Sequence, residues 1–160
     1  MNPDVSMIIG DTKFNFRVAC VVENNGKILL HKRDSDNFWN MVGGRAKCGE
    51  DTLSALNREM KEELNIEIKD AKLINVSENF FVYDNQNYHE MLFIYYHQTE
   101  DVELISKQDF VSLDNEHMIY HWFKKEEIKD IVCKPDIIYT IINQNPENLT
   151  HNIDIQKRDW

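Results

Sequence analysis

Four glutamates lie within one short stretch of this sequence, Gly44 to Ile66, and three of them fall within five residues. They are Glu50, Glu59, Glu62 and Glu63. On a helix, which turns by about 100° per residue, the last three share one face. Like charges at these spacings cost roughly 0.2–0.5 kcal/mol per pair. The cluster is therefore either a solvated helix face or a site for a hard cation such as Mg²⁺, which prefers carboxylate oxygens. Helix geometry alone leaves both interpretations open.

The residues around the cluster match the Nudix box. Its pattern is Gly, five residues, Glu, seven residues, then Arg-Glu-apolar-any-Glu-Glu-any-Gly-apolar. Gly44 opens the pattern here, Glu50 follows after five residues, and Arg58 begins the final segment "REMKEELNI". Eight of the nine spaced positions match, and the late glycine is replaced by Asn65. The family usually has Pro two residues before the box glycine, where this chain has Val42. The chain resembles a MutT-like Nudix hydrolase over about residues 15–145.

The resemblance implies a metal site in the box. Glu59 and Glu63 match the family's main metal-ligand glutamates, and Glu62 lies close by in support. The carbonyl oxygen of Gly44 often completes the ligand set. Glu50 matches a glutamate that either helps to bind the metal or holds the loop to the helix. The implied cofactor is Mg²⁺, with Mn²⁺ as a substitute, and the carboxylates suit either ion.

The resemblance also implies catalytic residues. Arg58 matches an arginine that orients the carboxylates through bidentate salt bridges. A carboxylate, either Glu59 or Glu116, would take a proton from the attacking water. Glu116 is chosen because the family often has a further carboxylate in a loop before a strand that bears Trp, and Glu116 lies six residues before Trp122. Asp114 is the reserve candidate, and an ordinary loop glutamate is the alternative interpretation of Glu116.

Two further residues are expected to contact the substrate. Arg33, at the end of the second strand, matches a basic residue that often faces phosphate, although a role in strand solubility fits it as well. Trp39 is the expected substrate-stacking residue, and several other aromatics are candidates to stack on a base or to belong to the core: Phe38, Phe80, Phe81 and Tyr83.

The function implied is hydrolysis of the pyrophosphate linkage of a nucleoside diphosphate joined to another moiety, such as ADP-ribose, a nucleotide sugar or a dinucleoside polyphosphate. One alternative is a pyrophosphohydrolase that cleanses the nucleotide pool of unwanted triphosphates. An alternative of another class is a nucleotide-binding sensor without turnover. The partner in each case is a small-molecule nucleotide, and homodimers are common in the family.

Hydrophobic patterning predicts the elements that must position these residues. Apolar positions Leu53, Leu56, Met60 and Leu64 recur with helical period, and Asp51 or Thr52 and Asn65 suit the two ends of that helix. Asn25-Gly26 is a hairpin turn signal. The predicted strands are 14–23, 27–33, 39–42, 70–83, 88–97 and 116–123, and the predicted helices are 52–65, 124–132 and 136–143.

These elements indicate an α/β (α+β) fold, in which a mixed β-sheet is sandwiched between helices as in the αβα Nudix fold. The length of 160 residues suggests a single domain over 1–160, with a core at about 15–145. After Asn143 the chain turns polar and is expected to fray.

Composition excludes several classes of protein. The net charge of −10 repels a phosphate backbone, so long nucleic acid is an unexpected partner, and a polyphosphate substrate would need a divalent cation. The three cysteines are far apart and suggest a reducing compartment. The N-terminus does not resemble a signal peptide, and no window approaches 18 apolar residues. We therefore expect a cytoplasmic protein that does not enter membranes.

Overall fold

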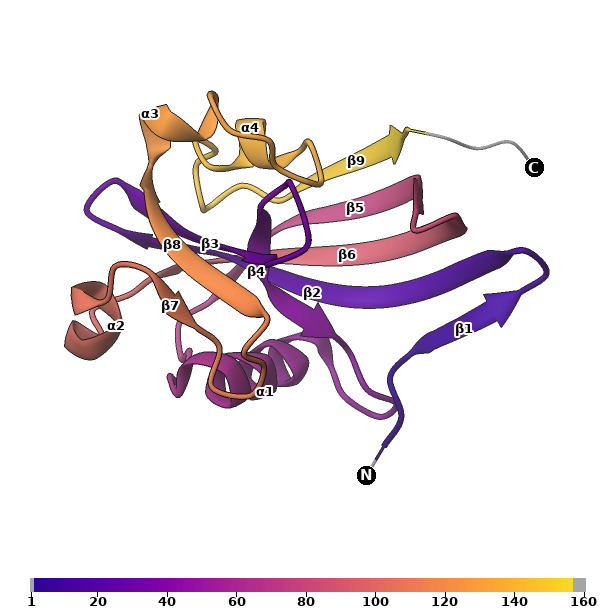
Figure 1. The fold of residues 1–160 in the computed structure, drawn as a ribbon, viewed down its shortest axis with the longest axis horizontal. Helices are drawn as coiled ribbons and strands as arrows, with labels where there is room; N and C mark the ends of the chain where they lie inside the picture. Colours follow the sequence, from indigo (N-terminus) through magenta and orange to yellow (C-terminus); the bar gives the residue numbers. More distant parts are fainter. Residues whose placement is uncertain (1, 157–160) are drawn as a thin grey trace.

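A nine-stranded mixed sheet forms the centre of the computed structural model, which describes residues 2–156 (Figure 1). Its strands are β1 (Ser6–Ile9), β2 (Thr12–Asn24), β3 (Lys27–Arg33), β4 (Asn40–Arg45), β5 (Lys72–Tyr83), β6 (Gln86–Gln98), β7 (Phe110–Val111), β8 (Met118–Lys124) and β9 (Thr150–Ile155). The helices are α1 (Thr52–Leu64), α2 (Val102–Ser106), α3 (Lys125–Ile128) and α4 (Ile138–Ile141). None of the helices in the described residues is long and apolar enough to cross a membrane.

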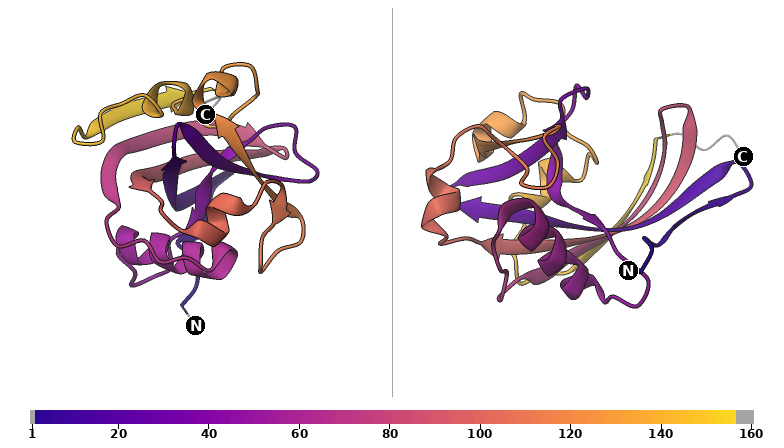
Figure 2. Two further views of the ribbon diagram at one scale, coloured as in Figure 1. Left: turned by 90° about the vertical axis from the view of Figure 1, so that its left-hand side faces the viewer. Right: turned by 60° about the horizontal axis from the view of Figure 1, so that its bottom comes forward.

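The strand order is β7-β8-β3-β4-β2-β6-β5-β9, and β1 pairs with residues 12–15 at the start of β2. Strands β2 and β6 run parallel, as do β5 and β9, and the remaining pairs are antiparallel. Helix α1 lies on one face of the sheet, and α3 and α4 lie on the opposite face (Figures 1 and 2). This arrangement confirms the predicted mixed sheet with helices on both sides.

Each face of the sheet has its own hydrophobic core. Under α1, the side chains of β2 that point to that face, such as Val18 and Val22, meet Leu56 and Met60 of the helix. On the other face, Val21 of β2 belongs to a cluster that includes residues of α3 and α4. The predicted turn between β2 and β3 is confirmed, because Asn25 and Gly26 have φ values of 47° and 75°.

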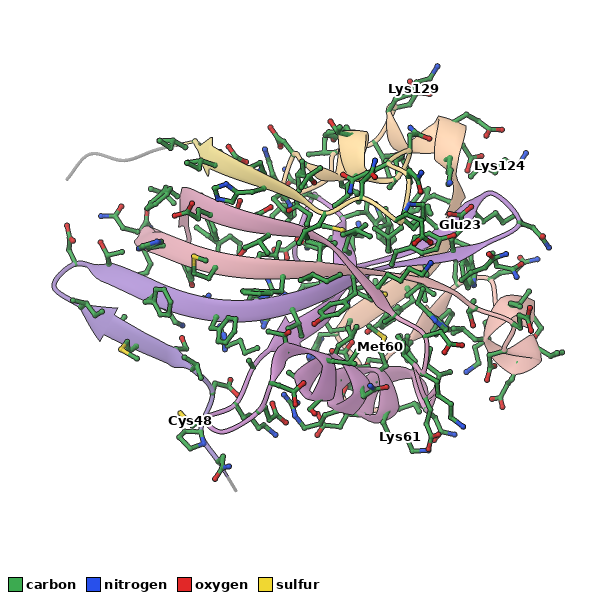
Figure 3. All side chains as sticks on the ribbon, turned by 180° about the vertical axis from the view of Figure 1, so that it is seen from behind. Glu23, Cys48, Met60, Lys61, Lys124 and Lys129 are labelled. Atoms are coloured by element: carbon green, nitrogen blue, oxygen red, sulfur yellow. The ribbon has the colours of Figure 1, made fainter. Side chains whose placement is uncertain are left out.

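Helix α1 begins and ends as its sequence predicts. The carboxylate of Asp51 accepts a hydrogen bond from the backbone N–H of Ser54 at 2.9 Å, and Asn65 ends the helix with φ of 58°. Met60 points toward the sheet, whereas Lys61 points away from it (Figure 3). The predicted apolar stripe is wrong at its first position, because Leu53 is 37% exposed and lies beyond the edge of the buried face.

The C-terminal region differs most from the sequence prediction. Residues after Asn143 were expected to fray, but β9 pairs in parallel with β5 over six residues. Buried Asn75 of β5 donates its side-chain amide to the hydroxyl of Thr150 at 2.9 Å. Ile153 and Ile155 of β9 are both more than half exposed, so burial of apolar side chains does not account for this pairing. The last predicted helix is also shorter than expected, since α4 spans only four residues.

Candidate active site

The structure contains a cavity of about 470 Å³. It extends from Glu59 and Glu63 of α1 across one face of strands β2, β6, β5 and β9, which is the face opposite α1. At one end it is lined by the box residues Gly44, Glu59 and Glu63, together with His31 and Arg33 of β3. At the other end it is lined by polar and aromatic side chains of the long strands, including Asn15, Asn79, Phe81, Tyr88, Glu90 and Asp154. The two ends therefore differ in chemistry.

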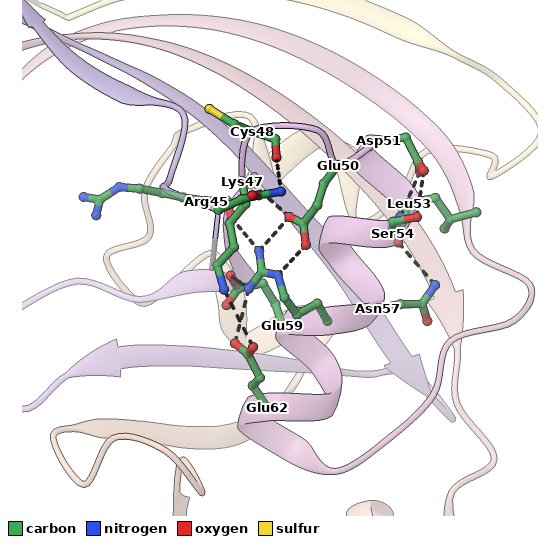
Figure 4. Close-up of polar contacts among 12 residues, drawn as sticks. Arg45, Lys47, Cys48, Glu50, Asp51, Leu53, Ser54, Asn57, Glu59 and Glu62 are labelled. Carbon is green, nitrogen blue, oxygen red and sulfur yellow. Dashed lines mark hydrogen bonds and ion pairs between the residues drawn. The ribbon is translucent and has the colours of Figure 1, made fainter.

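The guanidinium of Arg58 organises the box. It donates five hydrogen bonds, which equals its number of N–H groups. Its Nε and Nη2 donate hydrogen bonds to the carboxylate of Glu50 at 2.6 and 3.0 Å (Figure 4). Its Nη1 donates to Glu59 at 2.7 Å and to Glu62 at 3.2 Å. Nη2 also binds the carbonyl oxygen of Arg45 at 2.9 Å. The arginine thus fixes helix α1 to the loop that precedes it.

Glu50 and Glu62 do not line the cavity. Besides Arg58, Glu50 accepts a hydrogen bond from the backbone N–H of Lys47 at 2.9 Å, so both its oxygens hold the loop to the helix. These contacts hold the pKa of Glu50 below its usual range. The side chain of Glu62 is 44% exposed. Of the two roles expected for Glu50, its contacts favour the structural one.

Gly44 gives the carboxylate of Glu59 its place. A Cβ at Gly44 would lie 2.3–2.6 Å from the three carboxyl atoms of Glu59, so only glycine leaves room for this side chain. Burial raises the pKa of Glu59, and the neighbouring Arg58 opposes that shift. The carboxylate of Glu59 is therefore held at the cavity wall by its hydrogen bond with Arg58.

Glu63, one turn further along α1, lies deeper. The hydroxyl of Tyr120 donates a short hydrogen bond to its carboxylate, and the ring of His31 lies beside that tyrosine, with Nδ1 3.3 Å from the hydroxyl. Burial is the main cause that raises the pKa of Glu63 to about 7. The charges of Glu59 and Asp114 add to this rise in the pKa, and the hydrogen bond from Tyr120 opposes it. Burial also lowers the pKa of His31 to about 3, so the imidazole is neutral. Within the described residues, Glu63 forms no ion pair that would offset its charge.

The pair Glu59 and Glu63 fits a divalent cation. Among the described residues, no three carboxylate, imidazole or thiol side chains are grouped as a complete metal site. Mg²⁺, however, is commonly held by one or two carboxylates together with waters and substrate phosphates. One buried and one partly buried carboxylate that repel each other beside an open cavity suit that mode, because a cation would turn the repulsion into attraction.

The structure does not bring Glu116 to the box. Its side chain is 86% exposed, and its recorded ion-pair partner is His117, at 3.9 Å. Its neighbour Asn115 lines the cavity instead. The reserve candidate Asp114 is nearer to the box, since its charge acts on Glu63 and its carboxylate accepts a hydrogen bond from Ser112 at 2.5 Å.

Arg33 lies at the cavity as expected, but Trp39 does not. The indole packs edge-to-face on Phe123 with ring centroids 4.9 Å apart, and Lys32 lies over its ring. Trp39 therefore belongs to an aromatic cluster away from the cavity, and its neighbour Phe38 lines the wall. The other aromatic candidates also line it: Phe80, Phe81 and Tyr83.

Sequence reasoning missed a row of polar side chains on the long strands. Asn15 pairs with Glu90, Glu90 with Asn79, and Asn79 with Asp154, so the row crosses β2, β6, β5 and β9 on one face. Two buried side-chain atoms in residues 2–156 have no hydrogen-bond partner, Asn79 Oδ1 and Arg45 Nε, and both residues line this cavity. The available signal was polar residues at alternate positions in "NVSEN" of β5.

The two adjacent glycines of β4 predict a separation of folding from activity. Gly44→Ala should retain the fold but lower kcat/KM by about 10²-fold, because Cβ displaces only the carboxylate of Glu59. Gly43→Ala should instead lower the melting temperature sharply, because its Cβ would lie 2.1 Å from the carbonyl oxygen of Val18 and its φ is 149°. Thermal melts and steady-state kinetics on both variants check this. Equal loss of stability in the two variants would contradict it.

Comparison with known proteins identifies the class. The family model described as "NUDIX domain" matches residues 13–140, which is most of the chain. The chain therefore belongs to the Nudix family, a MutT-like class of enzymes that hydrolyse pyrophosphate linkages. Members of this family generally need divalent metal ions.

Two curated relatives illustrate the range of similarity. The chain is 43% identical over 54 residues to a CTP pyrophosphohydrolase of Escherichia coli, a match that covers 31% of this chain and 40% of that protein. It is 29% identical over 133 residues to an uncharacterized Nudix hydrolase of Listeria innocua, covering 79% of this chain and 73% of that protein. The chain thus spans less than half of the first relative.

Solved structures support the fold. A MutT protein from Bacillus halodurans has a TM-score of 0.67 at 18% identity, covering 90% of this chain and 93% of that one. The ORF135 protein of E. coli has a TM-score of 0.53 at 22% identity, covering 85% and 91%. At these identities the likeness shows the fold alone.

Proposed function

We propose that this chain is a Mg²⁺-dependent hydrolase that cleaves the pyrophosphate linkage of a nucleoside diphosphate joined to another group. The observation that carries the proposal is the pair of carboxylates, partly buried Glu59 and buried Glu63, at the wall of a cavity large enough for a small ligand. Burial raises the pKa of both carboxylates, although Arg58 opposes the shift at Glu59 and Arg17 opposes it at both glutamates. A bound divalent cation would offset the charge of both carboxylates and would also attract the anionic phosphates of a substrate.

Each residue of the site has a part in this reaction. Glu59 and Glu63 would hold the cation, with the carbonyl of Gly44 beside them, and bound Mg²⁺ would supply charge neutralisation and an activated water. Arg58 keeps Glu59 in place, and Arg33 faces the phosphates. Water attacks one phosphorus, the oxygen bridging to the other phosphate leaves, and a carboxylate takes the proton. Glu59 suits this last role better than Glu116, because Glu59 lines the cavity.

A second candidate is a nucleoside triphosphate pyrophosphohydrolase, in which the group joined to the nucleoside diphosphate is a single phosphate. The similarity to a CTP pyrophosphohydrolase favours this candidate, since it reaches 43% identity. The chemistry at the metal end is the same for both substrate classes, so the two candidates differ only in what leaves.

Product analysis decides between them. Purified protein with Mg²⁺ is incubated with ADP-ribose, nucleotide sugars, dinucleoside polyphosphates and ordinary and 8-oxo triphosphates, and the products are identified by mass spectrometry. Two monophosphates from a sugar conjugate support the first candidate, and a monophosphate with pyrophosphate supports the second. Binding of nucleotides without turnover of any of them, with Mg²⁺ or Mn²⁺ present, would overturn the hydrolase proposal in favour of a sensor.

A further inference from the structure

The end of the cavity away from the box carries an unsatisfied hydrogen-bond acceptor. The amide nitrogen of Asn79 donates to Glu90 Oε1 at 3.1 Å. An ionised glutamate only accepts, so this bond fixes the amide with Oδ1 pointing away from Glu90. Asn79 is only 2% exposed, and its buried Oδ1 has no hydrogen-bond partner within the described residues. A buried acceptor without a hydrogen-bond partner destabilises the protein unless a ligand supplies the missing donor.

Glu90 adds a second acceptor beside the first. It is 4% exposed, and its Oε2 lies 3.7 Å from Arg17 Nη1, which is too far for a hydrogen bond. Asp154 continues the same row on β9, next to Asn79. At this end of the cavity the carboxylates of Glu90 and Asp154 therefore outnumber the guanidinium of Arg17, which forms an ion pair with Glu90. This end suits N–H donors and disfavours phosphate, whereas Arg33 lies at the box end.

Aromatic rings lie next to these acceptors. Phe81 and Tyr88 form the next cross-strand pair along β5 and β6 on the same face, with their rings stacked at 4.9 Å. Phe38 and Tyr83 meet edge-to-face at 6.2 Å, and all four rings line the cavity. A flat aromatic ligand that carries N–H groups on its edge matches this combination of apolar surface and acceptors.

We propose that Asn79 and Glu90 form a nucleobase subsite that selects bases bearing an exocyclic amino group, namely cytosine, adenine or guanine. The amino hydrogens would bond to Asn79 Oδ1 and to Glu90 Oε2, which forms an ion pair with Arg17 but accepts no hydrogen bond from it. The phosphates would extend toward Glu59 and Glu63. This inference rests on the proposed function for its assumption that the ligand is a nucleotide. It adds the class of base, and it makes Asn79 and Glu90 determinants of specificity.

The test uses pairs of monophosphates in which one member lacks the exocyclic amino group. Uridine carries a carbonyl oxygen and an N3–H in place of the amino pattern of cytidine, and inosine carries hydrogen in place of the amino group of guanosine. Binding alone is measured, so the test needs no turnover. Calorimetry measures the Kd of cytidine against uridine monophosphate and of guanosine against inosine monophosphate. In at least one pair the amino member should bind the parent protein at least about tenfold more tightly. Asn79→Leu should remove that difference by weakening the amino member alone. Asn143→Leu, at an exposed position outside the cavity, is the matched control.

Glu90→Gln provides an independent variant in case Asn79→Leu does not fold. The glutamine amide can present a donor to the ligand, so preference should shift toward uridine or inosine, an effect that mere loss of packing would not produce. Equal affinity within both pairs for the parent protein would overturn the inference, even if the enzyme hydrolyses nucleotides. A preference for the amino member without hydrolysis of any substrate would support the subsite while contradicting the proposed function.

Discussion

Glu63→Gln is expected to lower kcat/KM by at least about 10²–10³-fold while the protein remains folded. The substitution removes one of the two carboxylates at the cavity wall but keeps the size of the side chain. The glutamine carbonyl can still accept the hydrogen bond from Tyr120, so the contact between α1 and β8 is preserved. Steady-state kinetics on the best substrate, at saturating Mg²⁺, measure the effect, and circular dichroism verifies the fold.

Glu116→Gln is the matched control for that experiment. It makes the same chemical change on an exposed side chain that does not line the cavity, so activity should stay within about twofold of the parent, as for ordinary surface substitutions. A large loss of activity in Glu116→Gln would restore the sequence-based expectation that this loop supplies the base. Full activity in Glu63→Gln would exclude the carboxylate pair as the metal site.

The box could be predicted from the sequence because its geometry is local. Asp51 and Asn65 set the ends of α1, and the spacing of Glu59 and Glu63 places both on one face of a single helix. The five hydrogen bonds of Arg58 also stay within this region, reaching no farther than Arg45. Spacing thus predicts that the two glutamates share one helix face, whereas their assignment to a metal site came from the resemblance to the Nudix box.

The substrate end could not be predicted, because it depends on strand pairings between distant segments. Trp39 was preferred over Phe38, but a bridge from Trp39 to Cys133 and packing on Phe123 turn the indole away from the cavity. Asn79 becomes part of a site only because β9 and β6 flank β5 in a particular register. Polar residues at alternate positions of a strand otherwise indicate only a face exposed to solvent.

In the absence of metal, the carboxylate of Glu63, which the proposed activity needs, is expected to lower the stability of the folded protein. Glu63 has a pKa of about 7 in the folded protein against an ordinary value of 4.5, so folding favours its protonated form. Below pH 4.5 the side chain is protonated in both states and causes no loss of stability. Between pH 4.5 and 7 the unfolded state releases the proton more readily, so this group lowers stability as the pH rises. The loss reaches about 3 kcal/mol above pH 7.

The parent protein alone would not isolate this effect, because buried His31 has the opposite dependence: its pKa is lowered to about 3, and its contribution is lost as the pH falls. The contribution of His31 is the same in both proteins, so it cancels when the unfolding free energy of the parent is subtracted from that of Glu63→Gln. With chelator present, the variant should be more stable by about 3 kcal/mol at pH 8 and equal to the parent near pH 4, as measured by denaturant unfolding. Mg²⁺ at a hundred times its Kd should return about 2.7 kcal/mol to the parent and little to the variant. A Glu63→Gln variant that is no more stable than the parent protein at pH 8 with chelator present would show that the buried carboxylate of Glu63 does not destabilise the folded state. The electrostatic argument for a cation at this position would then fail.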